Sequence, residues 1–344
     1  MRLITLEEHY RAPMIQEASH PAGFDATMNL SPQTPVGTRL AKLDDLGHAR
    51  LLDMDAAGID VQVLSHTVPA TEQFPPDQAV ALAKAANDYL ASAISATPDR
   101  FAAFATLPTP APAAAADELE RTVTQLGFKG ALINGHTQGR FLDDRFFWPI
   151  FERAQQLDVP IYLHPSEPPP AVRAAYYSGL PPAAAQMLAT AAWGWHVDTG
   201  LHALRLIIGG VFDEFPRLQI IIGHMGEALP FMLARSSSNL RDATGLNKPL
   251  EIYVAENFHV TTSGMFTYPP LLCLLLVLGA DRVMFSVDYP YSSNEQGRDF
   301  LLDAPISTTD KEKIAHTNAE RLLHLQPASD TTSVIVEAGG HDGP

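Results

Sequence analysis

Acidic and histidine side chains occur directly after several short apolar runs of this sequence. Glu7 and His9 follow the first run, and His164, His224 and Asp288 follow later ones. Residues two apart in an extended strand point to the same side, so Glu7 and His9 are expected to face one site. Carboxylates and imidazoles are common ligands of divalent metal ions. If the fold brings these residues together, they form a mixed nitrogen and oxygen metal site.

Each of these residues also has an ordinary structural explanation. A single histidine at a strand end is often a hydrogen-bonded core residue, and charged residues are mostly exposed. Asp288 is different, because a carboxylate at the end of a buried apolar strand requires a cation or a hydrogen-bond partner. The structural alternative to a metal site is a buried hydrogen-bond network.

The pattern of the chain predicts a closed (β/α)8 barrel. Short apolar or β-branched runs predict eight strands, at residues 3–6, 61–65, 101–106, 130–133, 160–163, 218–222, 258–262 and 282–286. Amphipathic segments predict helices at 75–96, 113–126 and 143–157, and the long gap after residue 163 leaves room for an extra element. An open doubly wound sheet is the alternative, but no G-x-G-x-x-G follows the first run.

In such a barrel the ends of all strands converge on one mouth, which is where active sites form. Residues 1–325 are therefore predicted to be one barrel domain with its metal site at the C-terminal mouth. Residues 11–46, rich in Pro, Gly, Ser and Thr, are predicted to form a rim or lid insertion. Residues 326–344 are predicted to be a C-terminal tail, either loose or packed on a neighbouring subunit.

Composition favours a small-molecule substrate. The chain has 344 residues with 39 acidic and 23 basic side chains, a formal charge of -16, which argues against nucleic acid or an anionic membrane as a partner. The N-terminus reaches Glu7 before a signal-like apolar region forms, and no apolar stretch is long enough for a membrane span. We therefore expect a cytoplasmic protein.

An ordered series of motifs spans nearly the whole chain. It runs Leu6-Glu7-Glu8-His9, Met54-Asp55-Ala56-Ala57-Gly58-Ile59-Asp60, Gly127-Phe128-Lys129-Gly130-Ala131, Tyr162-Leu163-His164-Pro165, Gly210-Val211-Phe212-Asp213-Glu214-Phe215-Pro216, Gly223-His224-Met225-Gly226-Glu227, Thr261-Thr262-Ser263-Gly264 and Phe285-Ser286-Val287-Asp288-Tyr289-Pro290-Tyr291. This series resembles the amidohydrolase superfamily, in the branch of γ-resorcylate, 2,3-dihydroxybenzoate and related aromatic acid decarboxylases. Hydrolytic members begin with His-x-His, whereas this chain has Glu7-x-His9, as the decarboxylases do.

The resemblance implies roles for individual residues. It assigns metal ligation to Glu7, His9, His164 and Asp288, and it places His224 beside the metal as a substrate or proton partner that Glu227 orients. It also implies that Arg235 lies near the polar groups of the substrate, reaching across a subunit interface, in a homodimer or homotetramer.

The implied activity is nonoxidative decarboxylation of a hydroxybenzoate-type acid, with Asp288 protonating the carbon that bears the carboxylate. Asn134, Trp193 and Tyr291 are the predicted contacts to the small aromatic carboxylic acid substrate. The ligand set favours Mn²⁺ or Zn²⁺ and is compatible with Mg²⁺. The alternatives are a metal-dependent hydrolase of a lactone or amide, a hydratase on the same scaffold, and a non-catalytic binding barrel.

Overall fold

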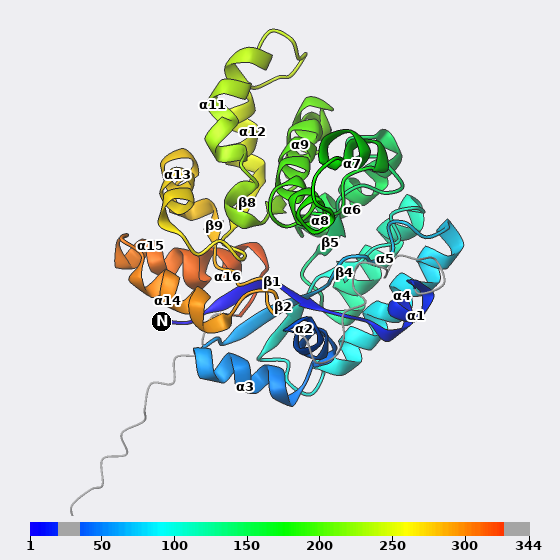
Figure 1. The fold of residues 1–344 in the computed structure, drawn as a ribbon, viewed down its shortest axis with the longest axis vertical. Helices are drawn as coiled ribbons and strands as arrows, with labels where there is room; N and C mark the ends of the chain where they lie inside the picture. The colour runs from blue at the N-terminus through cyan, green and yellow to red at the C-terminus, as the bar shows by residue number, and fades with distance from the viewer. Residues whose placement is uncertain (20–34, 327–344) are drawn as a thin grey trace, which may run out of the picture.

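The protein folds as a barrel of parallel strands surrounded by helices (Figure 1). The computed structural model describes residues 1–19 and 35–326. The strands are β1 (Ile4–Tyr10), β2 (Val61–His66), β3 (Phe101–Ala103), β4 (Ala105–Thr106), β5 (Ala131–Asn134), β6 (Ile161–His164), β7 (Ile220–Ile222), β8 (Phe258–Thr261) and β9 (Val283–Met284). Every predicted strand is therefore present.

The strands pair in chain order, and the ring closes at two weak points. β1, β2 and β3 form one parallel sheet, and β4 to β9 form the other. β3 and β4 are two halves of one predicted strand, interrupted at Phe104, whose N–H donates to the carbonyl of Leu64 at 2.9 Å. A single parallel bridge between Leu6 and Ser286 joins β1 to the end of β9. The predicted closed barrel is confirmed.

Helices follow most strands and cover the outside of the ring. They are α1 (Pro13–Ser19), α2 (Pro35–Asp44), α3 (His48–Ala57), α4 (Pro76–Ile94), α5 (Pro112–Leu126), η2 (Arg145–Phe147), α6 (Trp148–Leu157), α7 (Pro170–Tyr177), α8 (Pro182–Ala189), α9 (Gly194–Ile208), α10 (Val211–Glu214), η3 (His224–Gly226), α11 (Leu229–Leu240), α12 (Leu250–Asn257), α13 (Tyr268–Leu278), η4 (Ala280–Arg282), α14 (Asn294–Asp303), α15 (Thr308–Glu312), η5 (Lys313–Thr317) and α16 (Asn318–Leu322). The three predicted helices correspond to α4, α5 and η2 with α6, and the long gap holds α7 to α10.

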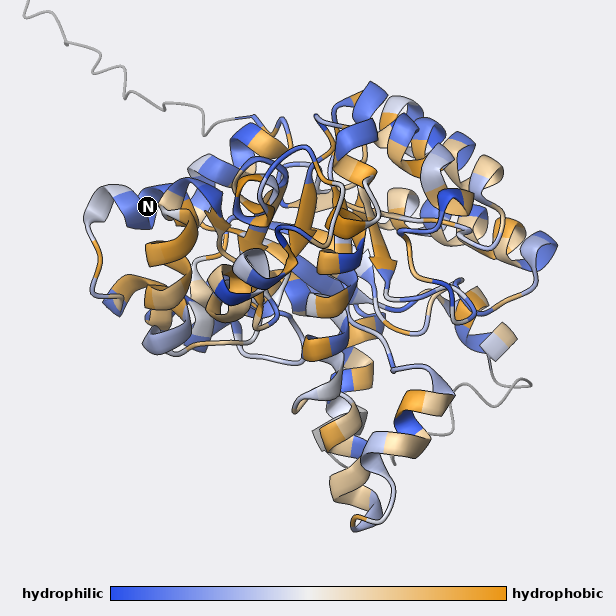
Figure 2. Ribbon diagram, turned by 90° about the horizontal axis from the view of Figure 1, so that it is seen from above, coloured by the Kyte–Doolittle hydropathy of each residue, from blue (hydrophilic) through white to orange (hydrophobic). Residues whose placement is uncertain are grey.

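Apolar side chains lie on both faces of the strands, as burial of a parallel sheet requires. Figure 2 shows the strands as a largely hydrophobic centre within a mixed outer layer. Leu132, Tyr162, Ile221 and Met284 belong to a cluster inside the ring, while Ile220 and other strand residues belong to a larger cluster shared with the helices. The strands therefore separate an apolar cluster inside the ring from a larger one between the strands and the helices.

The described parts of the predicted rim insertion are α1 and α2. Arg11 anchors this segment, because its side chain pairs with Asp44 at 2.6 Å and its N–H donates to the carbonyl of Leu43 at 3.0 Å. The rest of the insertion, residues 20–34, and nearly all of the predicted tail, residues 327–344, lie outside the described residues.

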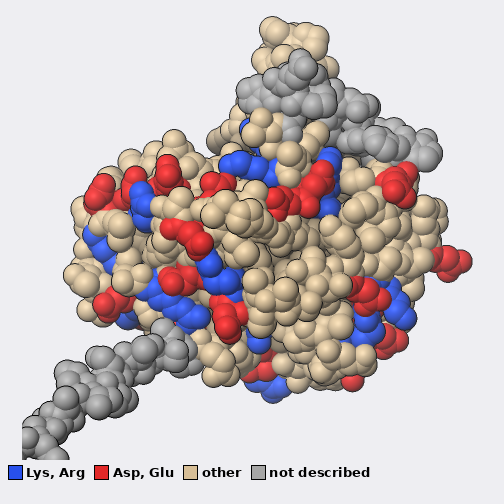
Figure 3. Space-filling model, turned by 90° about the horizontal axis from the view of Figure 1, so that it is seen from below, with Lys and Arg blue, Asp and Glu red and all other residues tan. Residues whose placement is uncertain are grey.

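Charge on the surface is mixed in sign. On the face drawn in Figure 3, basic and acidic side chains are interspersed and form no large basic patch. Among the described residues, no helix combines the length and the apolarity that crossing a membrane requires. A cytoplasmic location stays a prediction.

Gly130 provides a test of the strand packing. Its φ is 133°, and a Cβ atom there would lie 2.3 Å from the carbonyl oxygen of Pro160 at the start of β6. We expect Gly130→Ala to lower the free energy of unfolding by about 1–3 kcal/mol, because both backbone strain and a clash oppose the side chain. Urea denaturation measures this. Gly245→Ala is the control, since nothing lies within 4 Å of its Cβ position; equal stability of the two variants would contradict the prediction.

Candidate metal centre

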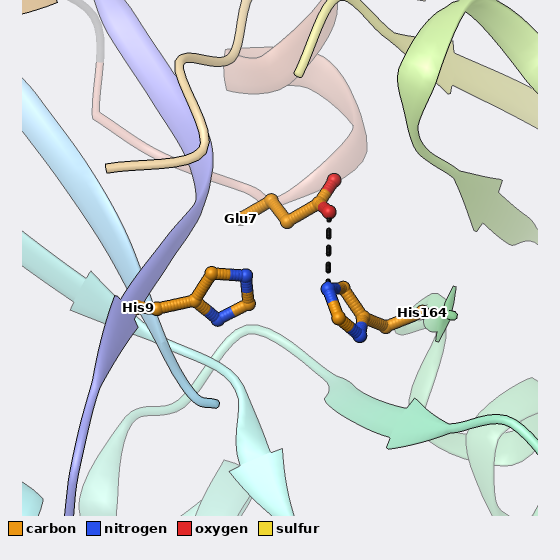
Figure 4. Close-up of side chains that lie close together, drawn as sticks. All are labelled: Glu7, His9 and His164. Atoms are coloured by element: carbon orange, nitrogen blue, oxygen red, sulfur yellow. Dashed lines mark ion pairs between the residues drawn. The ribbon is translucent and has the colours of Figure 1, made fainter. Parts of the chain in front are cut away.

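Three of the four predicted metal ligands lie together at the barrel mouth (Figure 4). Glu7 and His9 come from β1 and His164 from the end of β6, and one ligand atom from each lies within 4.8 Å of the other two. Glu7 Oε1 is 3.3 Å from His164 Nε2. Asp288, which follows β9, joins them through its Oδ1, 3.3 Å from His9 Nε2. The structure thus brings all four residues together.

The buried atoms of this cluster fit a divalent cation. Glu7 and His9 are fully buried, and Glu7 Oε1 and His9 Nε2 have no hydrogen-bond partner among the described residues. Leaving such atoms unpaired away from water is costly, more so for a carboxylate. A cation between them would satisfy the carboxylate oxygen and the imidazole nitrogen at once, and imidazole with carboxylate suits Mn²⁺ or Zn²⁺.

Hydroxyl groups fix the orientation of Glu7. Its other oxygen, Oε2, accepts hydrogen bonds from the hydroxyls of Tyr162 on β6 and Ser263 after β8, and the Tyr162 hydroxyl also contacts Thr261 Oγ1 at 2.7 Å. Gly223 makes room for this arrangement, because a Cβ atom there would lie 2.6 Å from Glu7 Oε2. Oε1 is therefore the oxygen left facing the histidines. Tyr162 and Ser263 lie within the quoted motifs, but nothing in their spacing predicted this contact.

A second cluster lies beside the first and involves His224. Glu227 is buried and accepts a hydrogen bond at each oxygen, from His224 Nδ1 at 2.7 Å and from His196 Nδ1 at 2.6 Å. The Nε2 atom of His224 is then directed at the candidate metal centre, 3.7 Å from Glu7 Oε1 and 3.9 Å from Asp288 Oδ2. The predicted contact between Glu227 and His224 is present, and His196 is the second partner of Glu227.

Electrostatics link the two clusters. Burial raises the pKa of Glu7, but the charges of His224 and His164 outweigh it and lower that pKa below its usual range. For His224, burial lowers the pKa, whereas the carboxylates of Glu227 and Glu7 raise it well above its usual value. In Glu227 the raising effect of burial is overcome by His224 and His196, so its pKa is lowered. Both carboxylates are therefore held ionised.

The backbone at the mouth is strained. Nine described residues other than glycine have positive φ, and six of them belong to this region: Glu7, His224, Met225, Glu227, Ala228 and Asp288. Each such conformation costs about 1–3 kcal/mol and is typical of functional sites. The φ of 59° at Glu7 coincides with a bulge, because the register of β1 against β2 shifts between Thr5 and Glu8. The strand therefore continues past the predicted residues 3–6 with a bulge at Glu7, and the side chains of Glu7 and His9 reach the same site, as their spacing predicted.

Two of the predicted substrate contacts adjoin the metal ligands. Asn134 ends β5 in register with His164, donates to Glu72 at 3.1 Å and keeps a buried Oδ1 without a hydrogen-bond partner in the described chain. The ring of Tyr291 lies edge-on to that of His9 with centroids 5.6 Å apart. Asn134 and Tyr291 therefore lie beside predicted metal ligands, and their contact with a substrate stays a prediction.

The other two predicted substrate contacts lie apart from the cluster. Trp193, just before α9, is 54% exposed, and Arg235 on α11 is also exposed. Within the residues that the structure describes, no hydrogen bond, ion pair or ring contact joins either side chain to the candidate metal centre. Their part in substrate binding stays a prediction.

Comparison with known proteins identifies the family. The amidohydrolase family model matches residues 25–325. The gamma-resorcylate decarboxylase of Rhodococcus jostii is 40% identical over 94% of this chain and 98% of its own length. A solved 2,6-dihydroxybenzoate decarboxylase in complex with 2,6-dihydroxybenzoate is 37% identical, with a TM-score of 0.85 over 94% of this chain and 100% of that one.

A second solved structure contains a metal ion. The dihydroxybenzoic acid decarboxylase of Polaromonas, with bound manganese and the inhibitor 2-nitroresorcinol, is 34% identical, with a TM-score of 0.85 over 96% of this chain and 99% of that one. The family model, the near full-length relative and the barrel with its clustered polar strand ends lead to one conclusion: this chain belongs to the amidohydrolase family.

Proposed function

We propose that the protein catalyses the metal-dependent, nonoxidative loss of carbon dioxide from a hydroxybenzoate-type aromatic acid. The observation that carries the proposal is that the buried atoms Glu7 Oε1 and His9 Nε2, which make no hydrogen bond among the described residues, lie 3.3 Å from His164 Nε2 and Asp288 Oδ1, respectively. The decarboxylase names of relatives that match this chain over nearly its full length support the reaction class.

Glu7, His9, His164 and Asp288 would hold the divalent ion, Mn²⁺ or Zn²⁺, with Mg²⁺ as a further option. When bound, the ion supplies Lewis acidity toward the carboxylate and the ortho hydroxyl of the substrate. A relative with bound manganese supports Mn²⁺ as the first metal to test.

The remaining chemistry is the transfer of one proton. Asp288, a carboxylate while it binds the ion, would take up a proton from solvent through His224 and pass it to the ring carbon that bears the carboxylate, so a C–H bond forms there and Asp288 returns to its ionised form. The bond to the carboxyl group then breaks, its electron pair restores the aromatic ring, and carbon dioxide leaves. His224, oriented by Glu227, holds the ring hydroxyl or relays the proton from the second cluster. His196 keeps Glu227 in place from the opposite side.

Asn134 and Tyr291 would then contact the ring of the substrate. The free Oδ1 of Asn134 is an acceptor for a ring hydroxyl, and the donation of Asn134 to Glu72 fixes which end of the amide faces the mouth. The Tyr291 hydroxyl is held by Thr67 Oγ1 at 2.6 Å, which keeps its ring against His9.

A homodimer or homotetramer is part of the proposal. α11 and α12 project from the barrel (Figure 1), and α11 contacts α13. Phe231 on α11 is 80% exposed and Leu276 on α13 is 88% exposed. Apolar side chains this exposed on contacting helices support an association surface there. A second copy seated on this surface would cover them, and the family resemblance implies that Arg235, also on α11, reaches the partner's site.

The reaction class is tested directly with a substrate panel. Metal-loaded protein is incubated with ortho-hydroxybenzoates and, separately, with lactones and amides, and the release of carbon dioxide and phenol is followed. We expect carbon dioxide from at least one hydroxybenzoate, loss of turnover on chelation, and recovery with Mn²⁺. Opening of lactones with no carbon dioxide release would identify a hydrolase instead.

Asp288→Asn tests the proton donor. An amide cannot donate the proton and is a poorer ligand, so we expect turnover to fall by about 10²–10⁴-fold with the far-ultraviolet circular dichroism unchanged. Asp281→Asn is the matched control, because Asp281 is an exposed carboxylate in η4, where it pairs with Lys313. Parental turnover in Asp288→Asn would remove Asp288 from the mechanism.

A charge introduced among the exposed side chains of α11 and α13, Phe231 and Leu276, tests this association surface. Phe231→Glu places a carboxylate on that surface, and we expect sedimentation to show a smaller assembly, since burying an unpaired charge is costly. Leu52→Glu, which changes a 55% exposed side chain on α3, should leave the mass unchanged. If Phe231→Glu keeps the parental mass, this face is not the interface.

A further inference from the structure

Glu8 stands between two predicted metal ligands, yet its carboxylate is directed at a different segment. Its Oε1 accepts the N–H of Val287 at 2.9 Å and the hydroxyl of Ser286 at 3.2 Å, and its Oε2 accepts the N–H of Tyr289 at 3.0 Å. Glu8 is fully buried. Its two oxygens therefore hold the backbone amides on either side of Asp288.

The carbonyls of the segment around Asp288 have other partners, since the N–H of Gly264 donates to Val287 at 3.1 Å and that of Ser292 to Asp288 at 3.0 Å, whereas the N–H groups of Val287 and Tyr289 donate to Glu8. Asp288 has a φ of 68°, a conformation that residues other than glycine rarely adopt and that needs support from its surroundings. The paired part of β9 ends at Met284, and β1 meets the segment after it through the single bridge from Leu6 to Ser286. The hydrogen bonds of Glu8 thus take the place of a regular ladder at the point where the barrel closes.

The neighbouring residue of β1 contacts the same segment. The N–H of His9 donates to the carbonyl of Tyr289 at 2.7 Å, so Glu8 and His9 together hold residues 287–289. A displacement of this segment would move Asp288 relative to His9, whose Nε2 is 3.3 Å from Asp288 Oδ1. The geometry of the predicted ligands therefore depends on the contact that Glu8 makes.

A buried arginine supplies the opposite charge. Arg50 donates to the carbonyl of His9 at 2.6 Å, and its guanidinium lies 4.7 Å from the centroid of the Tyr289 ring. Burial lowers the pKa of Arg50 to about 10, and the attraction of Tyr289 and Glu8 opposes that decrease. Burial raises the pKa of Glu8 to about 7, although the hydrogen bonds from the amides of Val287 and Tyr289 act to lower it. Glu8 is thus surrounded by donors and a cation, which suits a carboxylate that holds a backbone segment.

We infer that Glu8 is a positioning residue, which fixes Asp288 in the orientation needed to bind the metal ion and to deliver the proton. The inference rests on the proposed function for the role of Asp288. Partners that orient metal ligands typically contribute 10–100-fold to metal affinity or activity.

Two substitutions test it. Glu8→Gln keeps the size of the side chain but has one oxygen, so it cannot accept both amides. Glu8→Asp keeps the charge beside Arg50 but is too short to hold both amides, so it remains informative if Glu8→Gln fails to fold. We expect the Mn²⁺ dissociation constant, measured by electron paramagnetic resonance of the free ion without substrate, to rise about 10–100-fold in each folded variant, with a decrease in kcat.

Glu118→Gln is the matched control, because Glu118 is a buried carboxylate on α5 that is held by Asn87 and Arg121 far along the chain from the site. It should lower thermal stability but leave Mn²⁺ affinity and kcat at the parental values. Parental Mn²⁺ affinity in Glu8→Asp, or in folded Glu8→Gln, would overturn the inference. Because that measurement uses no substrate, it is distinct from failure of the parental protein on the hydroxybenzoate panel, which would bear on the reaction class alone.

Discussion

The burial of the Glu7 carboxylate is the constraint on which the mouth of the barrel depends. One oxygen is held by Tyr162 and Ser263, so the other faces His164 and His224 with no hydrogen bond of its own. A buried charge in that position needs a cation. Tyr162 and Ser263 turn the carboxylate so that Oε1 points toward the other predicted ligands. The left-handed backbone at Glu7, His224 and Asp288 is then explained as the conformational cost of directing three side chains to one point.

Most of the fold could be predicted because parallel barrel strands are buried on both faces and therefore appear as continuous apolar runs. Residues 218–222 and 258–262 illustrate this, since β7 and β8 lie within those limits. The interruption between β3 and β4 could not be predicted, because it depends on the pairing with neighbouring strands, where the N–H of Phe104 donates to the carbonyl of Leu64 on β2. The same holds for the closure at Leu6 and Ser286, where a single bridge replaces a ladder.

The candidate site was predicted less completely. The ligand types at strand ends indicated Glu7, His9, His164 and Asp288, because strand ends of a closed barrel must meet. Alternation along β1 would place Glu8 on the side away from Glu7 and His9 and gives it no function, whereas its role depends on the bulge and on the backbone of a segment almost 280 residues away. The contact between His196 and Glu227 was not predicted for a similar reason, because the two residues are 31 positions apart in the chain. Contacts between side chains and distant backbone leave no periodic signal in a sequence.

The number of carboxylates among the proposed ligands also bears on the choice of reaction. Glu7 and Asp288 together carry two negative charges, which balance a divalent ion, whereas a His-x-His strand would leave one positive charge in excess. An ion whose charge is already balanced activates water less strongly, because acidification of a ligand depends on the local net charge. It also holds a substrate carboxylate less tightly, so less binding energy is lost when that carboxylate leaves as neutral carbon dioxide. The balance of charge between Glu7, Asp288 and a divalent ion is therefore compatible with the proposed decarboxylation.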